Sequence, residues 1–135
     1  MSPPVLELLR SNGLPPDGLN DHLNMILVLR ENERVSGSAA LEIYDTAALL
    51  RSVAVERQRQ GKGWGKQLTN AMLKLAEEKG VTHVYLLTET ASDFFERFGF
   101  RRVDRSEVPL TVRSSVEFTS ACPESAMAML LPLKQ

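Results

Sequence analysis

The sequence predicts a mixed α/β fold, in which a mostly antiparallel central sheet is flanked by helices. A chain of 135 residues suits one hydrophobic core. Between residues 25 and 55, apolar β-rich runs alternate with short polar turns, which favours strands joined by hairpins. After residue 55 the apolar period changes to that of alternating helices and strands, which is typical of a sheet covered by helices. We therefore expect residues 1–135 to form a single domain.

The first half of the chain contains helix signals followed by strand signals. Prolines at the start and Gly13 at the end delimit a first helix, and a polar turn at 30–34 separates two β-rich runs. The predicted elements are two short helices and then three strands, over residues 3–13, 14–24, 25–29, 35–44 and 47–55.

The second half alternates between helical and strand periods. Leu68, Met72 and Leu75 form one helical stripe that Gly80 closes, and the apolar run after it is typical of a buried strand. The predicted elements are helix 66–79, strand 81–88, helix 91–98 capped by Thr90, strand 100–103, helix 109–118 and strand 126–133.

Composition excludes several classes of function. Sixteen Lys and Arg against seventeen Asp and Glu leave a net charge of -1, so we expect no nucleic-acid partner. One cysteine excludes an intramolecular disulfide, and with two histidines it makes a structural zinc site unexpected. No apolar run approaches the ~20 residues that span a bilayer, and the N-terminus lacks the order of a signal peptide. We expect a soluble cytoplasmic protein without a metal or a membrane partner.

The segment with the most chemical information is the glycine-rich turn between strand 47–55 and helix 66–79. Three glycines at alternate positions, Gly61, Gly63 and Gly65, precede the helix, and Lys62 and Lys66 flank them. Exposed backbone N–H groups at a helix N-terminus favour an anion, so the turn predicts a phosphate or pyrophosphate cradle. The spacing fits neither the P-loop nor the dinucleotide-binding fingerprint. A surface loop with ordinary lysines is the less favoured alternative.

The pattern Q/R-x-x-G-x-G/A is met by Gln60, Gly63 and Gly65, and on these residues the chain resembles the GNAT superfamily of acyl-CoA N-acyltransferases. The resemblance spans roughly residues 25–133 and includes FFERFGF, which is similar to the family's F-Y-x-x-x-G-F. It implies acetyl-CoA as co-substrate, with its pyrophosphate in the glycine turn. It also implies a bulged strand before the turn, on which the main chain of Val53 and Val55 pairs with the pantetheine arm.

Residues within the turn and further along the chain are additional candidates for contact with the coenzyme. Trp64 either anchors the turn on the sheet or stacks on the coenzyme. Ser92 either hydrogen-bonds the coenzyme or acceptor or caps its helix. Phe95 stands where the family often has a tyrosine that protonates the departing thiolate, so the acid role is vacant. Of the two remaining tyrosines, Tyr44 is a better candidate acid than Tyr85, although each is more typical of strand packing. The family usually opens with a strand before its first helix, whereas this chain starts in the predicted helix 3–13, so we expect the first strand to be missing.

The acceptor side offers fewer signals. Glu42 is the candidate general base, since a carboxylate is unusual among apolar strand residues, but the solvent face of an alternating strand explains it equally well. Arg51 either clamps a substrate carboxylate or pairs with Glu42 or another acid across the sheet. Arg113 either reaches an acidic acceptor or is an ordinary exposed arginine. Cys122 either lines the acceptor site or is a small buried hydrophobe.

Two groups within the superfamily are most similar: the acetyltransferase domains of N-acetylglutamate synthases and small acetyltransferases found with arsenic-resistance determinants. The resemblance implies transfer of an acetyl group to the primary amine of a small molecule, an amino acid or amino-acid-like compound, by direct attack in a ternary complex. The alternative is a non-catalytic acyl-CoA-binding or regulatory module on the same fold. A homodimer is a further expectation from the superfamily.

Overall fold

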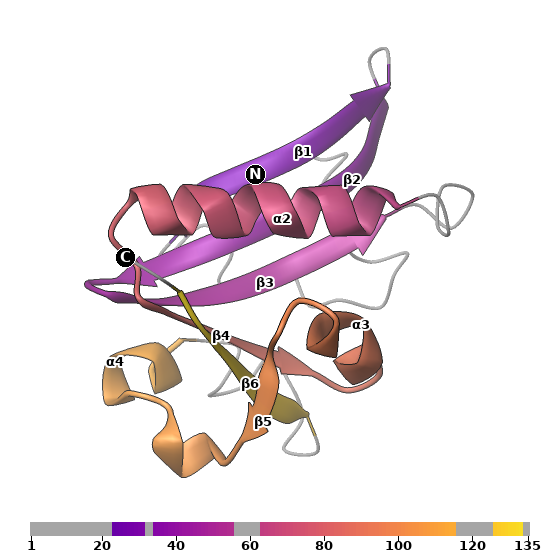
Figure 1. The fold of residues 1–135 in the computed structure, drawn as a ribbon. Helices are drawn as coiled ribbons and strands as arrows, with labels where there is room; N and C mark the ends of the chain where they lie inside the picture. Colours follow the sequence, from indigo (N-terminus) through magenta and orange to yellow (C-terminus); the bar gives the residue numbers. More distant parts are fainter. Residues whose placement is uncertain (1–22, 32–33, 56–62, 116–125, 134–135) are drawn as a thin grey trace.

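A computed structural model describes residues 23–31, 34–55, 63–115 and 126–133. Six strands form one sheet in the order β1-β2-β3-β4-β6-β5 (Figure 1). Only β3 and β4 run parallel, and the other neighbours are antiparallel. The predicted mixed and mostly antiparallel sheet is therefore confirmed. The helix predicted over 3–13 and the missing first strand concern residues outside the described ranges.

The first three strands form a meander, β1 (Leu23–Glu31), β2 (Arg34–Tyr44) and β3 (Ala47–Val55). β1 and β2 are longer than predicted, because pairing extends to Glu31 and Arg34 on either side of the turn. β1 also includes residues 23–24, which the sequence assigned to the end of a helix. The turn from β2 to β3 places Asp45 at φ 61°, a left-handed conformation that a short polar side chain tolerates better than most.

The helix α2 (Trp64–Glu78) covers one face of the sheet (Figure 1). Leu68 and Met72 of the predicted stripe are buried against β2 and β3, whereas its third member, Leu75, is only half-buried and Ala76 is buried instead. Gly80 follows the helix with φ 84°, which glycine adopts without steric cost. The main core of the protein lies between α2 and the sheet.

After α2 the chain completes the sheet with β4 (His83–Thr88), β5 (Arg101–Val103) and β6 (Met127–Pro132). The helix α3 (Ser92–Glu96) joins β4 to β5 and is shorter than predicted. Its N-cap is Ala91, not Thr90, and the Ala91 N–H donates to Thr88 Oγ1 over 3.0 Å.

The second apolar cluster includes Leu49, Tyr85 and Leu130 and packs with the helix α4 (Leu110–Arg113). A 3₁₀ turn, η2 (Arg105–Glu107), precedes α4 and was not predicted. The helix predicted over 109–118 was wrong in length, because α4 ends at Arg113. The Ser114 N–H still donates to the Leu110 carbonyl as in a helix, but the Ser115 N–H donates to the Val112 carbonyl, three residues back.

Candidate active site

The parallel strands β3 and β4 separate halfway along their length. Their pairing covers three positions and ends at Leu49 and Tyr85, whereas β3 continues to Val55 and β4 to Thr88. Figure 1 shows the two strands diverging toward the end where α2 begins. In the described part of the chain no strand pairs with this edge of β3 beyond Leu49. An extended ligand can therefore lie along β3 as a neighbouring strand would.

A β-bulge lies at the start of this separation. Ser38 pairs with Ala54 and Ala40 pairs with Arg51, so two residues of β3, Ser52 and Val53, lie opposite one residue of β2. Ser52 has φ 60°, a conformation that costs a non-glycine residue on the order of 1 kcal/mol or more. The Ser38 hydroxyl donates to the Ser52 carbonyl over 3.0 Å and so holds the bulge in place. The bulge that the family resemblance implied is therefore present, although no feature of the residues alone indicated Ser52.

The predicted anion cradle is described from Gly63 onward, and Gln60, Gly61 and Lys62 lie outside the described residues. Gly63 is the N-cap of α2 with φ 81°, and no side chain caps the first turn of the helix. The first turn also contains no acidic residue, so among the described groups nothing competes with an anion for its N–H groups. Lys66 is exposed beside it.

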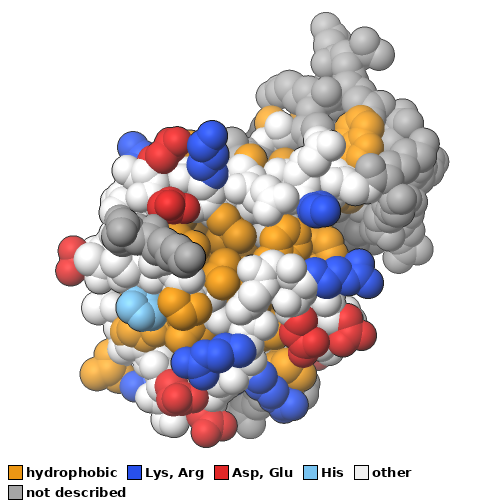
Figure 2. Space-filling model, in the orientation of Figure 1, with side chains coloured by type: hydrophobic (Ala, Val, Ile, Leu, Met, Phe, Trp, Pro, Cys, Tyr) orange, Lys and Arg blue, Asp and Glu red, His pale blue; other side chains and the backbone are white. Residues whose placement is uncertain are grey.

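Two residues after Gly63 the helix passes close to its neighbours. A Cβ atom on Gly65 would lie 3.6 Å from the Phe94 ring and 3.7 Å from Val55, which is ordinary contact. Trp64 is half-buried and packs against the main core, as the predicted anchoring role requires. On the face shown in Figure 2, apolar side chains gather across the middle of the molecule with basic side chains at the edges of the patch.

The aromatic residues of α3 form a cluster with Phe98 and Phe100. Phe94 and Phe95 meet edge to face with ring centroids 5.0 Å apart, and Phe95 meets Phe100 in the same way at 5.7 Å. Phe95 is buried in the main core. The position that often carries a tyrosine in the family is thus a packing position in this chain. Ser92 is half-buried at the first residue of α3 and does not cap the helix.

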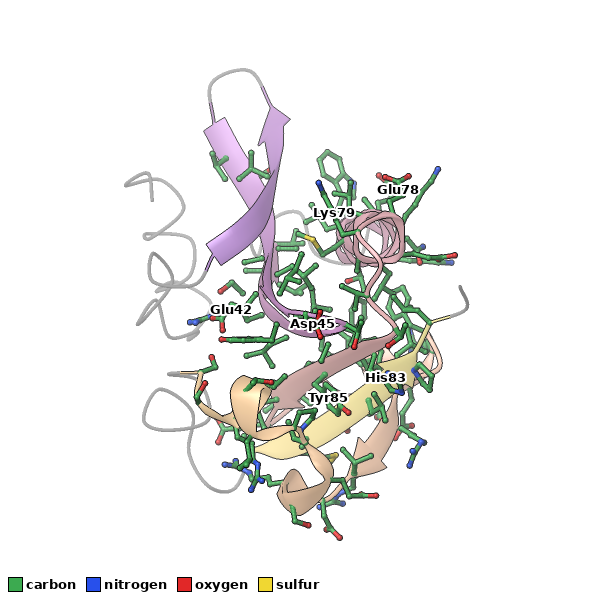
Figure 3. The ribbon with its side chains drawn as sticks, turned by 90° about the vertical axis from the view of Figure 1, so that its left-hand side faces the viewer. Glu42, Asp45, Glu78, Lys79, His83 and Tyr85 are labelled. Atoms are coloured by element: carbon green, nitrogen blue, oxygen red, sulfur yellow. The ribbon has the colours of Figure 1, made fainter. Side chains whose placement is uncertain are left out.

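The face of the sheet away from α2 carries a buried ion pair. Arg51 Nη1 lies 2.8 Å from Glu42 Oε2, and the two side chains are 0% and 2% exposed. Figure 3 shows Glu42 on the side of the hairpin opposite α2. The solvent-face explanation of Glu42 is therefore wrong, and Arg51 has the acidic partner that one interpretation of the sequence gave it. Glu42 lies opposite Leu49, the last residue of β3 that pairs with β4, so the ion pair sits where the strands begin to separate.

Tyr44 joins this pair through its hydroxyl group. The Tyr44 O–H donates to Glu42 Oε1 over 2.5 Å. Burial, followed by the hydrogen bond to Glu42 and its negative charge, raises the pKa of Tyr44 to about 12. Ser115 hydrogen-bonds the same phenol oxygen and lowers the pKa, as a donor to that oxygen does. Ser115 is fully buried two residues after α4, and the sequence did not single it out.

The remaining candidates on the acceptor side differ in their surroundings. Arg113 is half-buried on α4, and its Nε is buried without a hydrogen-bond partner among the described residues. An ordinary exposed arginine is thus not what the structure contains at this position. Cys122 lies outside the described residues.

The described residues contain no group of three or more His, Cys, Asp or Glu side chains placed to hold a metal ion. Within the same ranges no helix combines the length and the apolar character needed to cross a membrane.

The separated parallel strands, the bulge and the start of α2 without a side-chain cap agree with the site that the resemblance to the GNAT superfamily implied. The pattern of the acetyltransferase (GNAT) domain family matches residues 22–102, and the chain belongs to this family. The predicted class of enzyme, an acyltransferase, is therefore confirmed.

Similar proteins agree with this assignment. An uncharacterised N-acetyltransferase of Chlorobaculum tepidum is 28% identical over 119 residues, which are 85% of this chain and 76% of that protein. An amino-acid acetyltransferase of Neisseria meningitidis is 26% identical over 97 residues, which are 70% of this chain and 22% of that protein.

Among solved structures, N-acetylglutamate synthase from Neisseria gonorrhoeae, complexed with coenzyme A and N-acetyl-glutamate, superposes with a TM-score of 0.82 at 20% identity. The match covers 98% of this chain and 33% of the synthase. The chain thus corresponds to only a part of the two Neisseria proteins, and at this identity the superposition shows a shared fold.

Proposed function

We propose that the protein is an acetyl-CoA-dependent N-acetyltransferase that acts on the primary amine of a small molecule. The observation that carries the proposal is the open edge of β3, which starts after Leu49, includes the bulge at Ser52 and ends at Val55 beside the start of α2. An extended pantetheine arm matches this edge, and a pyrophosphate matches the uncapped helix start. Coenzyme A in a structure of the same fold supports the identity of the co-substrate.

In this proposal the coenzyme occupies the α2 end of the site. The main chain of Val53 and Val55 pairs with the pantetheine arm, and the N–H groups after Gly63 hold the pyrophosphate. Trp64 and Phe95 support this region from the core, and Ser92 lies on the adjoining helix. The residues assigned to the phosphate cradle are Gln60, Gly61, Lys62, Gly63, Gly65 and Lys66.

The acceptor occupies the opposite side, near Glu42 and Tyr44. An amino acid or an amino-acid-like compound is the proposed class, in line with the amino-acid acetyltransferase that this chain resembles. Arg51 is neutralised by Glu42, so Arg113 is the stronger candidate for an acceptor carboxylate. Cys122 and an arsenical acceptor remain parts of the proposal that rest on sequence resemblance alone.

The reaction requires direct attack of a neutral amine on the thioester carbonyl in a ternary complex. A positioned amine needs no enzyme nucleophile, because the thioester is already activated. The new C–N bond forms as the C–S bond breaks, and the thiolate leaves. Glu42 is the proposed base and Tyr44 the proposed acid. Tyr44 holds a proton at neutral pH, as any tyrosine does, and its hydrogen bond to Glu42 is what supports a role in proton transfer.

Calorimetric titration with acetyl-CoA tests the first half of this proposal, and thiol release in the presence of an amine panel tests the second. The panel holds the common L-amino acids, their α-amides and simple alkylamines. Binding in the micromolar range together with amine-dependent thiol release is the expected result. Absence of binding at millimolar acetyl-CoA contradicts the proposal as a whole.

The second candidate function is a non-catalytic acyl-CoA-binding or regulatory module. The buried position of Phe95 favours it, because the usual acid is absent from α3. Coenzyme binding without thiol release for any amine of the panel is the result that this alternative predicts. Under either function we propose a cytoplasmic protein without a nucleic-acid or membrane partner, and a homodimer that size-exclusion chromatography with light scattering will test.

A further inference from the structure

Glu42, Tyr44, Arg51 and Ser115 form one hydrogen-bonded network on the acceptor face of the sheet. It joins β2, β3 and the segment after α4, three parts of the chain that are distant in sequence. Both hydrogen bonds to Glu42 are donated to its carboxylate. Arg51 donates to one carboxylate oxygen and Tyr44 donates to the other.

The burial of the four members identifies the point of entry. Glu42, Arg51 and Ser115 are at most 3% exposed, whereas Tyr44 is only partly buried. An acceptor amine therefore has no direct path to the Glu42 carboxylate. It can reach the network through the Tyr44 hydroxyl, which lies 2.5 Å from Glu42 Oε1.

Resting on the function proposed above, we propose that Tyr44 is a proton relay between the acceptor amine and Glu42. The acceptor ammonium passes a proton to the Tyr44 oxygen while Tyr44 passes its own proton to Glu42 Oε1. The products of this step are a neutral amine, an intact phenol and a protonated Glu42. No phenolate forms at any stage, so the reluctance of Tyr44 to ionise does not oppose the step.

The remaining steps balance without another reactant. The neutral amine attacks the thioester carbon, the C–N bond forms and the C–S bond breaks. The nitrogen loses its second proton to water, and the proton on Glu42 returns through Tyr44 to the departing thiolate. The network thus serves as base in one direction and as acid in the other, which accounts for the packing role of Phe95 on α3.

The other two residues are positioning residues. Arg51 holds the Glu42 carboxylate at the place where β3 and β4 separate. Ser115 hydrogen-bonds the phenol oxygen and so leaves the phenol hydrogen directed at Glu42.

The variant Tyr44→Phe tests the relay, with Tyr85→Phe as the matched control. Tyr85 is the other tyrosine of the chain and is buried on the same face, in the second apolar cluster, outside the Glu42 network. We measure kcat/KM across pH for the best acceptor in the amine panel. Removal of the relay should lower kcat/KM about 100-fold near pH 7, which is the usual scale of proton-transfer catalysis. Above the amine pKa, near pH 10, the loss should shrink to about 3-fold or less, because the acceptor arrives neutral.

The outcomes separate this inference from the proposed function. A wild-type protein that binds acetyl-CoA but acetylates no amine contradicts both. An active wild type whose Tyr44→Phe variant loses the same factor at every pH contradicts the relay alone and leaves the acetyltransferase standing. If Tyr44→Phe does not fold, Ser115→Ala provides the test, with a loss of about 3- to 10-fold near pH 7 that also disappears at high pH. A loss independent of pH in Ser115→Ala contradicts the relay as well.

Discussion

The guanidinium of Arg51 lies 2.8 Å from the carboxylate of Glu42, and neither side chain reaches solvent. A buried pair of this kind gains Coulomb energy but loses the hydration of both charges, so its net contribution to stability is small. Removal of one partner is different, because it leaves an uncompensated charge in the interior. The pair therefore constrains which substitutions the hairpin of β2 and β3 accepts.

We expect Glu42→Leu and Arg51→Met each to lower the free energy of unfolding by about 3–5 kcal/mol, because each leaves a buried charge alone. The double variant Glu42→Leu with Arg51→Met should lose at most about 2 kcal/mol, because no charge is left behind. Urea unfolding followed by circular dichroism measures all three. Losses that simply add in the double variant would show that the two groups do not depend on each other.

Local sequence signals predicted the coenzyme side of the molecule better than the acceptor side. The stripe of Leu68 and Met72 and the glycine Gly63 are separated by a few residues, so the period and spacing of α2 can be read along the chain. The contact of Arg51 with Glu42 depends on the register of β2 against β3. Arg51 lies opposite Ala40, and the bulge shifts this register, so no spacing in the sequence indicates the pair.

The segment after α4 illustrates the same limit. A helix was predicted to residue 118, but α4 ends at Arg113. Ser114 Oγ, the next residue's hydroxyl, donates to the Thr111 carbonyl over 2.6 Å. Ser115 then turns inward to the Tyr44 hydroxyl. Serine competes with helical hydrogen bonding through such contacts, and the tertiary partner on β2 cannot be read from residues 109–118.

The titration of Tyr44 gives a prediction about alkaline pH. The pKa of Tyr44 is about 12 in the folded protein, mainly because of burial, whereas the ordinary pKa of tyrosine is 10.0. The unfolded chain therefore loses this proton first, and the folded state loses stability as the pH rises from about 10 to about 12. Below this window both states hold the proton and Tyr44 contributes no pH dependence.

The ultraviolet absorbance of the tyrosine phenolate follows this titration directly. The chain contains two tyrosines, so the difference between wild type and Tyr44→Phe isolates Tyr44. The difference curve should have its midpoint about two pH units above that of free tyrosine. A midpoint close to that of free tyrosine would mean that the Tyr44 hydroxyl is neither buried nor hydrogen-bonded to Glu42 in solution.

Phe95→Tyr tests whether the usual family acid can be restored by one substitution. Phe95 is buried in the main core among apolar side chains, so a hydroxyl on this ring would be removed from water. We expect a loss of stability of about 1–3 kcal/mol and no increase in kcat. Phe98→Tyr is the matched control, because Phe98 belongs to the same aromatic cluster, two residues after α3, but is only half-buried. A higher kcat in Phe95→Tyr would indicate that the thiolate leaves next to α3. It would contradict Tyr44 on β2 as the proton donor.

Gly63→Asp tests the position of the anion cradle, and the chain offers Gly80→Asp as its matched control. Both glycines have positive φ, 81° and 84°, and a Cβ atom on either meets no atom within 4 Å. Backbone strain is therefore similar in the two variants, and neither introduces a clash. The two glycines lie at opposite ends of α2, because Gly63 precedes its first turn and Gly80 follows its last turn. A carboxylate at Gly63 would occupy the helix N–H groups and repel a pyrophosphate.

We expect Gly63→Asp to raise the Kd for acetyl-CoA more than about 100-fold, against less than about 3-fold for Gly80→Asp. Calorimetric titration of the two variants, each shown to be folded by circular dichroism, decides the matter. Equal affinity in both variants would remove the pyrophosphate from the start of α2.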